Sequence, residues 1–455
     1  MMKKALLTIA FAFTAMSYMF AGKPVFQLKY TADPSPVIFN DTIFIYTSHD
    51  EDDAQGYGFK MLNWILYTTT DMVNFTEHGV VAELKEFAWR SRDNGAWAQQ
   101  VVTRNGKYYM YCPLHGHGIG VLVSDSPYGP FKDALGEPLV WQKEHWEDID
   151  PTILIDTDGQ AYMTWGNPNV YCVKLNKDMI STSGPIMKLQ APAHYQEGPW
   201  TYKRNGHYYM AFASTCCPEG LGYAMANSPV GPWEFKGYIM EPTQRDRGNH
   251  PGIVEYKGNA YVFGQSYDLL KEDYKAAGEE FKHHERRSVA AAEMLYQGDG
   301  TIETVPYWLD TEIKPIKSFD PYQKVKATTM AWGFRMVSRQ NQKDGIYVTG
   351  IDNGDFISLR QVDFGKKGAK SFTASVANVK EGCSIEVRLD AKEGALVASL
   401  PLSATGEDFT EFSCKVKGAK GTHDLYFVFC GPEDGQPFNP TKTDGIMQFK
   451  YWIFK

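Results

Sequence analysis

Residues 40–48 read NDTIFIYTS, and four later stretches repeat this pattern of a tight turn followed by a run of β-formers. The four are NGKYYMYCP (105–113), DGQAYMTWG (158–166), NGHYYMAFA (205–213) and KGNAYVFGQ (257–265). Asn-Gly and Asp-Gly turns that lead into aromatic and β-branched residues are typical of β-hairpins. The five stretches recur at intervals of 47 to 65 residues, and sheets repeating at such an interval predict a radial array. We therefore expect an all-β protein with a five-bladed β-propeller over residues 23–318. A β-sandwich with coincidental hairpins is the alternative.

Residues 319–455 carry strand patterns of a different kind. Segments such as FTASVANV (372–379), SIEVRLDA (384–391) and DLYFVFCG (424–431) alternate apolar and polar residues between Gly and Asp turns. This pattern predicts a second domain, a β-sandwich of the jelly-roll type.

Composition narrows the function before any motif is considered. The 455 residues include 46 Lys and Arg against 54 Asp and Glu, a net charge of -8, which argues against nucleic acid as a partner. Aromatic residues make up 14% of the chain, and flat rings with polar handles suit both β-sheet cores and sugar-facing pockets.

The N-terminus resembles an export signal. Lys3 and Lys4 precede an apolar run from Ala5 to Phe20 and the small pair Ala21 and Gly22. We interpret residues 1–22 as a secretory signal peptide, which predicts a periplasmic or secreted protein. The alternative is an N-terminal membrane anchor, although the apolar run is short for a span. No later segment predicts a membrane helix, so no span is expected after signal cleavage.

Seven cysteines are scattered along the chain without the spacing of a metal site. We read them mainly as small buried hydrophobes. In an oxidising compartment Cys383 is a candidate to bridge Cys414 or Cys430.

One residue in each repeat stands eight or nine positions before the turn marker. These residues are Asp33, Trp97, Asp150, Glu197 and His250. Equivalent positions in successive blades lie at equivalent radii, so we expect the five side chains to meet at one end of the central axis. Proline follows Asp33, Asp150 and His250 directly, which predicts an extended backbone at these residues.

Three converging carboxylates repel one another, so at least one of them should hold its proton near neutral pH. Cleavage of a glycosidic bond needs this division, because an acid protonates the leaving oxygen while a base activates water. The same ligand types could instead hold a divalent cation, although no compact metal motif is present. Capping of turns or pairing with arginines is the structural alternative.

The sequence around these residues resembles glycoside hydrolase family 43. The resemblance rests on YTADPSPVIF (30–39), GAWAQQ (95–100), DIDPTILI (148–155), QEGPW (196–200), GNHPGI (248–253) and RRSVAAAEML (286–295). It implies a five-bladed propeller that acts on arabinose- and xylose-containing plant polysaccharides with inversion. It also implies that Asp33 is the general base, that Glu197 is the general acid, and that Asp150 raises the pKa of the acid and orients it.

The resemblance suggests further site residues. His250 would bind substrate and help to hold a water-coordinated calcium ion at the axis, while no cofactor is required. Arg287, with Arg286 as the adjacent alternative, would contact substrate hydroxyls. Trp97 and Trp165 are candidate sugar-binding rings. In many members proline occupies the position of Gln99, and its loss should alter a pocket wall.

The C-terminal part resembles carbohydrate-binding module family 6 in VTGIDNGDFISLRQVDFG (348–365) and KGTHDLYFVF (420–429). Three calcium-binding acids of that family match Lys326, Thr328 and Lys450, so we predict no structural calcium in this domain. The ligand Asn and Trp match Gln448 and Tyr451, which puts the usual cleft in doubt. Trp332 and Tyr347 remain candidate sugar-stacking rings.

These observations predict an exo-acting, inverting glycosidase. It would release arabinofuranosyl or xylosyl units from arabinoxylan-type plant cell-wall polysaccharides or their oligosaccharides. An endo-acting xylanase or arabinanase, which needs an open groove, is one alternative. A propeller that binds sugars without cleaving them is the other.

Overall fold

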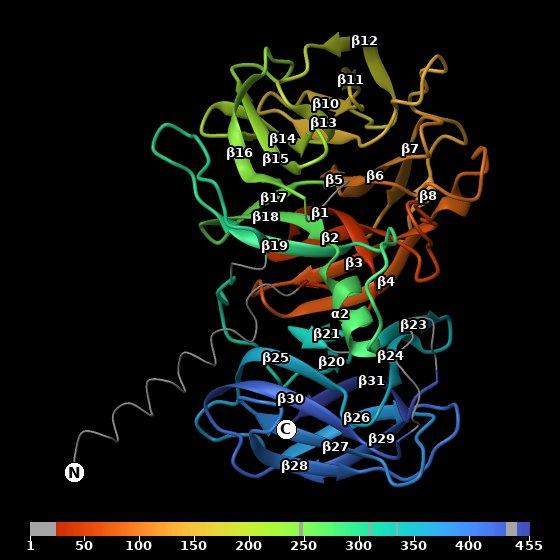
Figure 1. Cartoon of the computed structure of the whole chain (residues 1–455), viewed down its shortest axis with the longest axis vertical. Coiled ribbons are helices and arrows are strands. Elements are labelled where there is room, and N and C mark those ends of the chain that lie inside the picture. Colours follow the sequence, from red (N-terminus) through yellow and green to blue (C-terminus); the bar gives the residue numbers. More distant parts are fainter. Residues whose placement is uncertain (1–23, 245–248, 309–311, 334, 434–443) are drawn as a thin grey trace.

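The structure is a computed structural model that describes residues 24–244, 249–308, 312–333, 335–433 and 444–455. The described residues form an all-β protein with an N-terminal region and a C-terminal region (Figure 1). The predicted signal peptide, residues 1–22, lies outside the described residues. None of the described helices has the length and apolar character needed to cross a lipid bilayer.

The described part of the N-terminal region contains five antiparallel sheets. The first sheet consists of β1 (Thr31–Phe39), β2 (Thr42–His49), β3 (Asn63–Thr69) and β4 (Phe75–Glu83). The second consists of β5 (Gln100–Arg104), β6 (Lys107–Pro113), β7 (Ile119–Ser124) and β8 (Lys132–Asp133). The third consists of β9 (Thr152–Ile155), β10 (Ala161–Trp165), β11 (Val170–Leu175) and β12 (Thr182–Leu189). The fourth consists of β13 (Tyr195–Arg204), β14 (His207–Ser214), β15 (Glu219–Ala226) and β16 (Glu234–Thr243). The fifth consists of β17 (Gly252–Tyr256), β18 (Asn259–Ser266) and β19 (Ser288–Met294).

Each of the five repeated stretches forms the turn and second strand of the first hairpin in its sheet. In the second sheet Arg104 pairs with Lys107 across Asn105 and Gly106, whose φ angles are 54° and 76°. Positive φ at both central residues is what a two-residue type I′ turn requires, which explains the Asn-Gly signal. The hairpins predicted from these stretches are therefore confirmed.

The first strands of the five sheets lie together. β1 contacts both β5 and β17, β5 contacts β9, and β9 contacts β13. Residues at the start of these strands, far apart in the sequence, therefore meet in one place. A helix, α2 (Asp268–Ala277), and a short 3₁₀ helix, η1 (Leu84–Glu86), interrupt the strands of this region.

The C-terminal region is a β-sandwich, as predicted. One sheet has the order β22-β25-β30-β27-β28, and the other has the order β23-β24-β31-β26-β29 with β20 paired to β31. The strand bounds are β20 Val325–Lys326, β22 Trp332–Gly333, β23 Val337–Asn341, β24 Gly345–Ile351, β25 Phe356–Asp363, β26 Ser371–Ala377, β27 Ser384–Leu389, β28 Ala395–Pro401, β29 Thr410–Lys415, β30 Thr422–Cys430 and β31 Met447–Phe454. Phe372, Phe427, Phe449 and Trp452 are fully buried in one apolar cluster, the core of the sandwich.

The two regions share a sheet edge. Strand β21 (Thr329–Met330) pairs with β4, so that Thr329 lies opposite Thr76. The hydroxyls of these two threonines are 2.8 Å apart.

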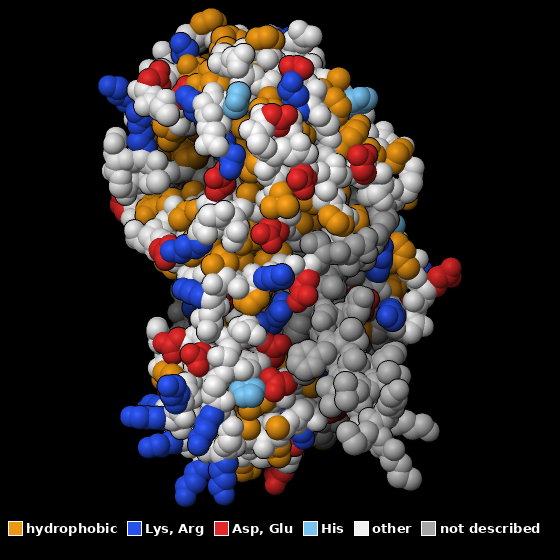
Figure 2. All heavy atoms as spheres, turned by 90° about the vertical axis from the view of Figure 1, so that its left-hand side faces the viewer, with side chains coloured by type: hydrophobic (Ala, Val, Ile, Leu, Met, Phe, Trp, Pro, Cys, Tyr) orange, Lys and Arg blue, Asp and Glu red, His pale blue; other side chains and the backbone are white. Residues whose placement is uncertain are grey.

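On the face drawn in Figure 2, Lys and Arg side chains gather at the lower end, over the C-terminal region.

The predicted bridge from Cys383 to Cys414 or Cys430 is wrong, because all three cysteines are free. Cys430 lies opposite Ser384 on paired strands, so alternation directs the Cys383 side chain to the other face of that sheet. Cys414 lies in the other sheet, opposite Phe372.

The two candidate sugar-stacking rings of the sandwich have little surface exposed to stack on a sugar. Trp332 is buried, and it lies close to Tyr30 and Asp273 of the N-terminal region around a small cavity. Tyr347 is half-buried beside Phe409, with ring centres 5.4 Å apart.

Candidate active site

A pocket of about 200 Å³ opens where the first strands of the five sheets meet. Its walls contain all five residues that the sequence placed in phase, together with Arg287. The complete lining is Asp33, Phe59, Met61, Trp97, Ala98, Trp146, Ile149, Asp150, Glu197, His250 and Arg287.

Asp33 lies on β1 and is almost fully buried. Its backbone has a φ of 53°, in the left-handed region, at an irregularity of the β1–β2 register between Ala32 and Ser35. The expectation of an extended backbone before proline is therefore wrong for Asp33, and it is wrong for Asp150, whose φ is 58°. Bulges re-aim side chains, and non-glycine residues with positive φ cluster at functional sites. The peptide N–H of Asp33 donates to Gln265 Oε1 at 2.8 Å, which stabilises this turn.

Glu197 lies on β13, between two register shifts, and is half-buried in the wall of the pocket. The amide of Asn167 donates to its Oε2. The next residue, Gly198, donates its peptide N–H to Asp150 Oδ2 at 3.2 Å. A Cβ at Gly198 would lie 2.9 Å from His250 Nδ1, and φ there is +61°, so only glycine fits between Glu197 and the imidazole.

Arg287 is anchored by a bidentate ion pair with Asp50, with Nε and Nη2 each 2.9 Å from a carboxylate oxygen. Its Nη1 lies 3.3 Å from Asp33 Oδ1. Because these carboxylates favour its charged form more than burial opposes it, the pKa of Arg287 is raised well above its usual value. Of the two predicted arginines, Arg287 lines the pocket, while Arg286 donates to the carbonyl of Ala54.

His250 lies within ion-pair distance of the carboxylates of Asp33 and Asp150. Its Nε2 lies 3.6 Å from Asp150 Oδ2, and its Nδ1 lies 4.0 Å from Asp33 Oδ1. Burial lowers the pKa of His250, but the attraction of Asp150, Asp33 and Glu197 outweighs it and raises the pKa above its ordinary value. The three acids therefore favour the cationic form of the imidazole.

Burial, together with the neighbouring Glu197 and Asp33 carboxylates, raises the pKa of Asp150 to about 7, although the attraction of His250 opposes them. The expectation that one acid of the cluster holds its proton near neutral pH therefore agrees with the geometry. One ligand atom from each of Asp150, Glu197 and His250 lies within 4.8 Å of the others. Asp150 and Glu197 are therefore close enough to share a proton.

This donor set does not fit directly bound calcium. Calcium takes six to eight oxygen ligands, whereas the cluster offers two carboxylates and one imidazole nitrogen. The imidazole is, in addition, drawn toward its cationic form by the same acids. A calcium ion held through water beside His250 stays a prediction, and no step below depends on it.

The aromatic residues of the site only partly follow the sequence prediction. Trp97 lines the pocket, with its ring centre 4.3 Å from that of His115. Trp165 does not reach the pocket: it is fully buried, and its indole N–H donates to Asp148 at 2.8 Å. Trp165 is the last residue of β10, and the alternation of side chains along this strand directs its ring into the packing between sheets.

Sequence reasoning missed several residues that complete the site. Asp50, which holds Arg287, stands in the SHDE tail of the first motif, and Gln265 ends the fifth repeat. Phe59 and Trp146 are wall residues on loops, and no periodic signal marks them. Position 99 holds a buried Gln beside the wall residue Ala98.

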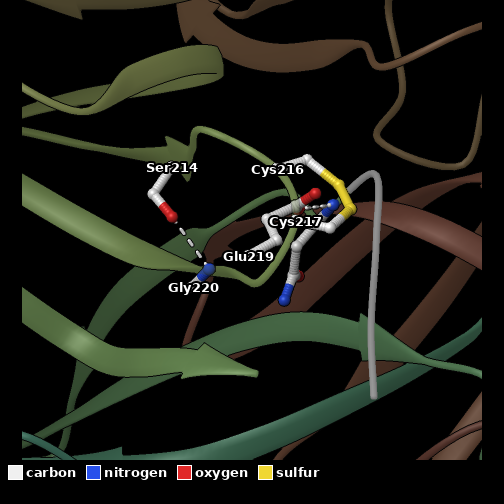
Figure 3. Close-up of a disulfide and its surroundings, with 6 residues drawn as sticks. Ser214, Cys216, Cys217, Glu219 and Gly220 are labelled. Atoms are coloured by element: carbon white, nitrogen blue, oxygen red, sulfur yellow. Dashed lines mark hydrogen bonds between the residues drawn. A yellow bond between two sulfur atoms is a disulfide. The ribbon is translucent and has the colours of Figure 1, made fainter. Parts of the chain in front are cut away.

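A disulfide joins the neighbouring residues Cys216 and Cys217 in the loop between β14 and β15 (Figure 3). Glu219 lies beside it and accepts a hydrogen bond from the peptide N–H of Asn249 at 2.5 Å. Asn249 in turn accepts from the peptide N–H of His250. The loop is therefore connected to the pocket through two hydrogen bonds.

Two segments of the chain match known families. Residues 21–302 match the glycosyl hydrolases family 43, and residues 326–442 match the carbohydrate binding module (family 6). The chain belongs to glycosyl hydrolase family 43 and carries a family 6 carbohydrate-binding module, as the sequence motifs indicated. It is accordingly a glycosidase.

Two relatives match more than nine-tenths of this chain. An arabinoxylan arabinofuranohydrolase from Bacillus subtilis is 29% identical over 95% of this chain and 92% of its own length. An enzyme of the same name from Paenibacillus polymyxa is 30% identical over 92% of this chain and 73% of its own. The crystal structure of a family 43 arabinoxylan arabinofuranohydrolase from Bacillus subtilis, in complex with cellotetraose, superposes with a TM-score of 0.80. It is 27% identical and covers 97% of this chain and 99% of the other.

Proposed function

We propose that the protein is an exo-acting glycosidase that removes arabinofuranosyl units, or alternatively xylosyl units, from arabinoxylan or xylan with inversion. The five sheets of the N-terminal region would be the blades of a propeller whose axis carries the pocket. The observation that carries the proposal is the meeting of Asp33, Asp150 and Glu197 in one pocket beside Arg287. Arabinofuranosyl release ranks first because the two relatives matched over nearly the whole chain are named for it.

In this proposal Glu197 protonates the leaving oxygen, since it is the least buried of the three acids in the pocket. Asp33 takes a proton from the attacking water, and its Oδ1 is held 3.3 Å from Arg287 Nη1. Asp150 accepts a hydrogen bond from the peptide N–H of Gly198, the residue after Glu197, and from there it would orient the acid and tune its pKa.

The size of the pocket supports exo action. A volume of about 200 Å³ is below the range of roughly 300–1,000 Å³ usual for drug-sized ligands, and it suits one terminal sugar ring. Phe59, Met61 and Ile149 give apolar walls that exclude water from the carboxylates. The remainder of the polysaccharide would lie outside, toward the exposed Trp146.

Chromatography of the products from wheat arabinoxylan tests the proposal. Free arabinose is the expected product, and free xylose would assign the xylosidase activity instead. Oligomers alone would show endo action, and no product would favour a propeller that only binds sugars. Protein carrying Glu197→Gln is the matched control. Anomeric proton NMR of the first-formed product should show inverted configuration, and retention would refute the single-displacement mechanism.

We also infer export to the periplasm or the medium, from the pattern of residues 1–22. Mass spectrometry of the protein recovered from its native host should give a mature N-terminus near residue 23.

A further inference from the structure

The turn that carries Asp33 is held by a side chain from outside the pocket. Gln265 lies on β18, is 1% exposed and is not among the described residues that line the pocket. Its Oε1 accepts the peptide N–H of Asp33 at 2.8 Å, although 232 positions separate the two residues in the chain. Asp33 and Pro34 fall in the gap of the β1–β2 register, between the paired residues Ala32 and Ser35. The Gln265 amide therefore satisfies a buried peptide N–H at the point where the pairing of β1 with β2 is interrupted.

Asn249 holds Gln265 in turn. Its side chain is buried, and its Oδ1 accepts the peptide N–H of Gln265 at 3.1 Å and that of His250 at 3.0 Å. A Cβ at Gly264 would lie 2.9 Å from this oxygen, so the lack of a side chain at position 264 leaves the room that the Asn249 amide occupies. Glu219 Oε1 accepts the peptide N–H of Asn249 at 2.5 Å. One amide oxygen thus fixes the peptides of His250, which lines the pocket, and of Gln265, which holds the proposed base.

The backbones of the first and fifth sheets approach closely beside the bond from Asp33 to Gln265. Strand β1 contacts β17, β18 and β19, and a Cβ at Gly252, the first residue of β17, would collide with the carbonyl oxygen of Pro34. The side chain of Asp33 is held by another residue, since Arg287 Nη1 lies 3.3 Å from its Oδ1. Different residues therefore hold the main chain and the side chain of Asp33, and the bond to Gln265 can be removed without changing either member of the ion pair.

We propose that Gln265 is a positioning residue for the reaction and that it acts through the peptide of Asp33. By fixing this peptide in the left-handed conformation, the Gln265 amide sets the direction in which the Asp33 carboxylate meets the attacking water. The inference rests on the proposed function, in which Asp33 is the base. A displacement of about 1 Å can lower the rate about 10²-fold, so the loss of this bond should be visible in kcat.

Gln100 makes the same kind of bond at another junction between sheets and provides a matched control. Its Oε1 accepts the peptide N–H of Ile153, which joins β5 to β9. Both glutamines are buried, and each amide oxygen accepts a peptide N–H from the first strand of a neighbouring sheet. Ile153 is outside the set of described residues that line the pocket. Gln265→Met and Gln100→Met therefore each remove the acceptor of such a bond, but only Gln265 holds an acid of the pocket.

Thermal melts and steady-state kinetics of the two variants of the whole protein test the inference. The substrates are arabinoxylan and a nitrophenyl glycoside, the arabinofuranoside or the xyloside, whichever the wild type cleaves faster. We expect both variants to lose melting temperature by similar amounts. Only Gln265→Met should lower kcat, by about 10²-fold, with little change in KM because Gln265 is not part of the pocket wall.

The two substrates separate a defect at the base from a defect at the acid. Water must be activated whatever the leaving group, so Gln265→Met should lower kcat equally on both substrates. Glu197→Gln, by contrast, should affect the nitrophenyl glycoside less than arabinoxylan, because nitrophenolate leaves more readily without a proton. A purely structural role of Gln265 predicts no such difference between its variant and that of Gln100.

Equal kcat values for folded Gln265→Met and Gln100→Met would overturn the inference. So would a fall in kcat confined to arabinoxylan, which would place the defect at the acid. If Gln265→Met does not fold, Asn249→Ala takes its place, because it removes the acceptor of the Gln265 peptide N–H, and an unchanged kcat there would have the same meaning. Failure of the proposed function has a different signature, since wild-type protein would then release neither nitrophenol nor sugar.

Discussion

The pocket is surrounded by buried charged side chains, whereas the core of the sandwich is made of apolar side chains. Around the pocket Asp33, Asp50, Asp150 and Arg287 are buried within a few ångströms of one another or of His250. The sandwich core is an apolar cluster that runs through both of its sheets. Burial of charge is unfavourable unless it is paired, whereas burial of apolar surface stabilises by about 25 cal/mol per Å². The paired charges of the pocket suit proton transfer at some expense of stability, whereas the apolar core of the sandwich stabilises the fold.

Among the variants that test this comparison, Glu197→Gln should have the largest effect, and the effect should be on activity. Loss of general acid catalysis should lower kcat on arabinoxylan by about 10²–10⁴-fold. The side chain is only partly buried and Gln keeps its shape, so the melting temperature should stay close to that of the wild type. Steady-state kinetics and a thermal melt provide the two readouts. Near-normal turnover of arabinoxylan would remove Glu197 from the role of acid.

The sandwich should respond in the opposite way. Phe427 is fully buried against Phe372 and Trp452, so Phe427→Ala should lower the free energy of unfolding of its region by about 3–5 kcal/mol. Guanidinium melts followed by tryptophan fluorescence measure the loss. At a temperature where the variant remains folded, kcat on a small aryl arabinofuranoside should be unchanged. A large fall in kcat would show that the two regions are not separable in this way.

Asp150→Asn should affect activity and stability in opposite directions. The folded-state pKa of Asp150 is about 7, against about 3.9 for an unfolded Asp, so the unfolded state releases this proton first as pH rises. The ionised carboxyl therefore destabilises the fold increasingly between about pH 4 and pH 7. We expect the Asn variant to gain melting temperature relative to wild type at pH 8, to gain less at pH 5, and to lose activity at both. A gain that falls with rising pH would contradict the assignment.

The smallest effect concerns the boundary between the regions. Thr76→Val keeps the shape of the side chain but removes the hydroxyl that lies 2.8 Å from that of Thr329. The loss of one such hydrogen bond should lower the free energy of unfolding by about 0.5–1.5 kcal/mol and leave kcat unchanged. Thr70→Val, in the loop after β3, removes a hydroxyl that is not part of this pair and serves as a control. Equal melts for both variants would indicate that the bond does not couple the regions.

Much of the fold could be read from the sequence because its signals are local. The turn residues Asn105 and Gly106 and their counterparts define hairpins by their own backbone preferences, and the period of these hairpins indicates repeated sheets. Five in-phase residues then point to one site, since equivalent positions in repeated sheets occupy equivalent places. The structure brings all five into the lining of one pocket.

Other features depend on packing between distant segments, which no local pattern records. The sequence could not distinguish Trp97, which reaches the pocket, from Trp165, which packs behind it against Asp148. Nor could it indicate that Cys383 and Cys430 occupy opposite faces of one sheet, or that Asp50 holds Arg287.

The sequence alone therefore determined the β-rich class, the two regions, the glycosidase family and the three acids, because turns, alternation and repeat phase act over a few residues. Tertiary structure alone decided the left-handed backbone of Asp33 and Asp150, the pKa of Asp150 near 7 and the shape of the pocket. Burial, charge proximity and cavity shape are properties of side chains brought together from distant parts of the chain, and they exist only after folding.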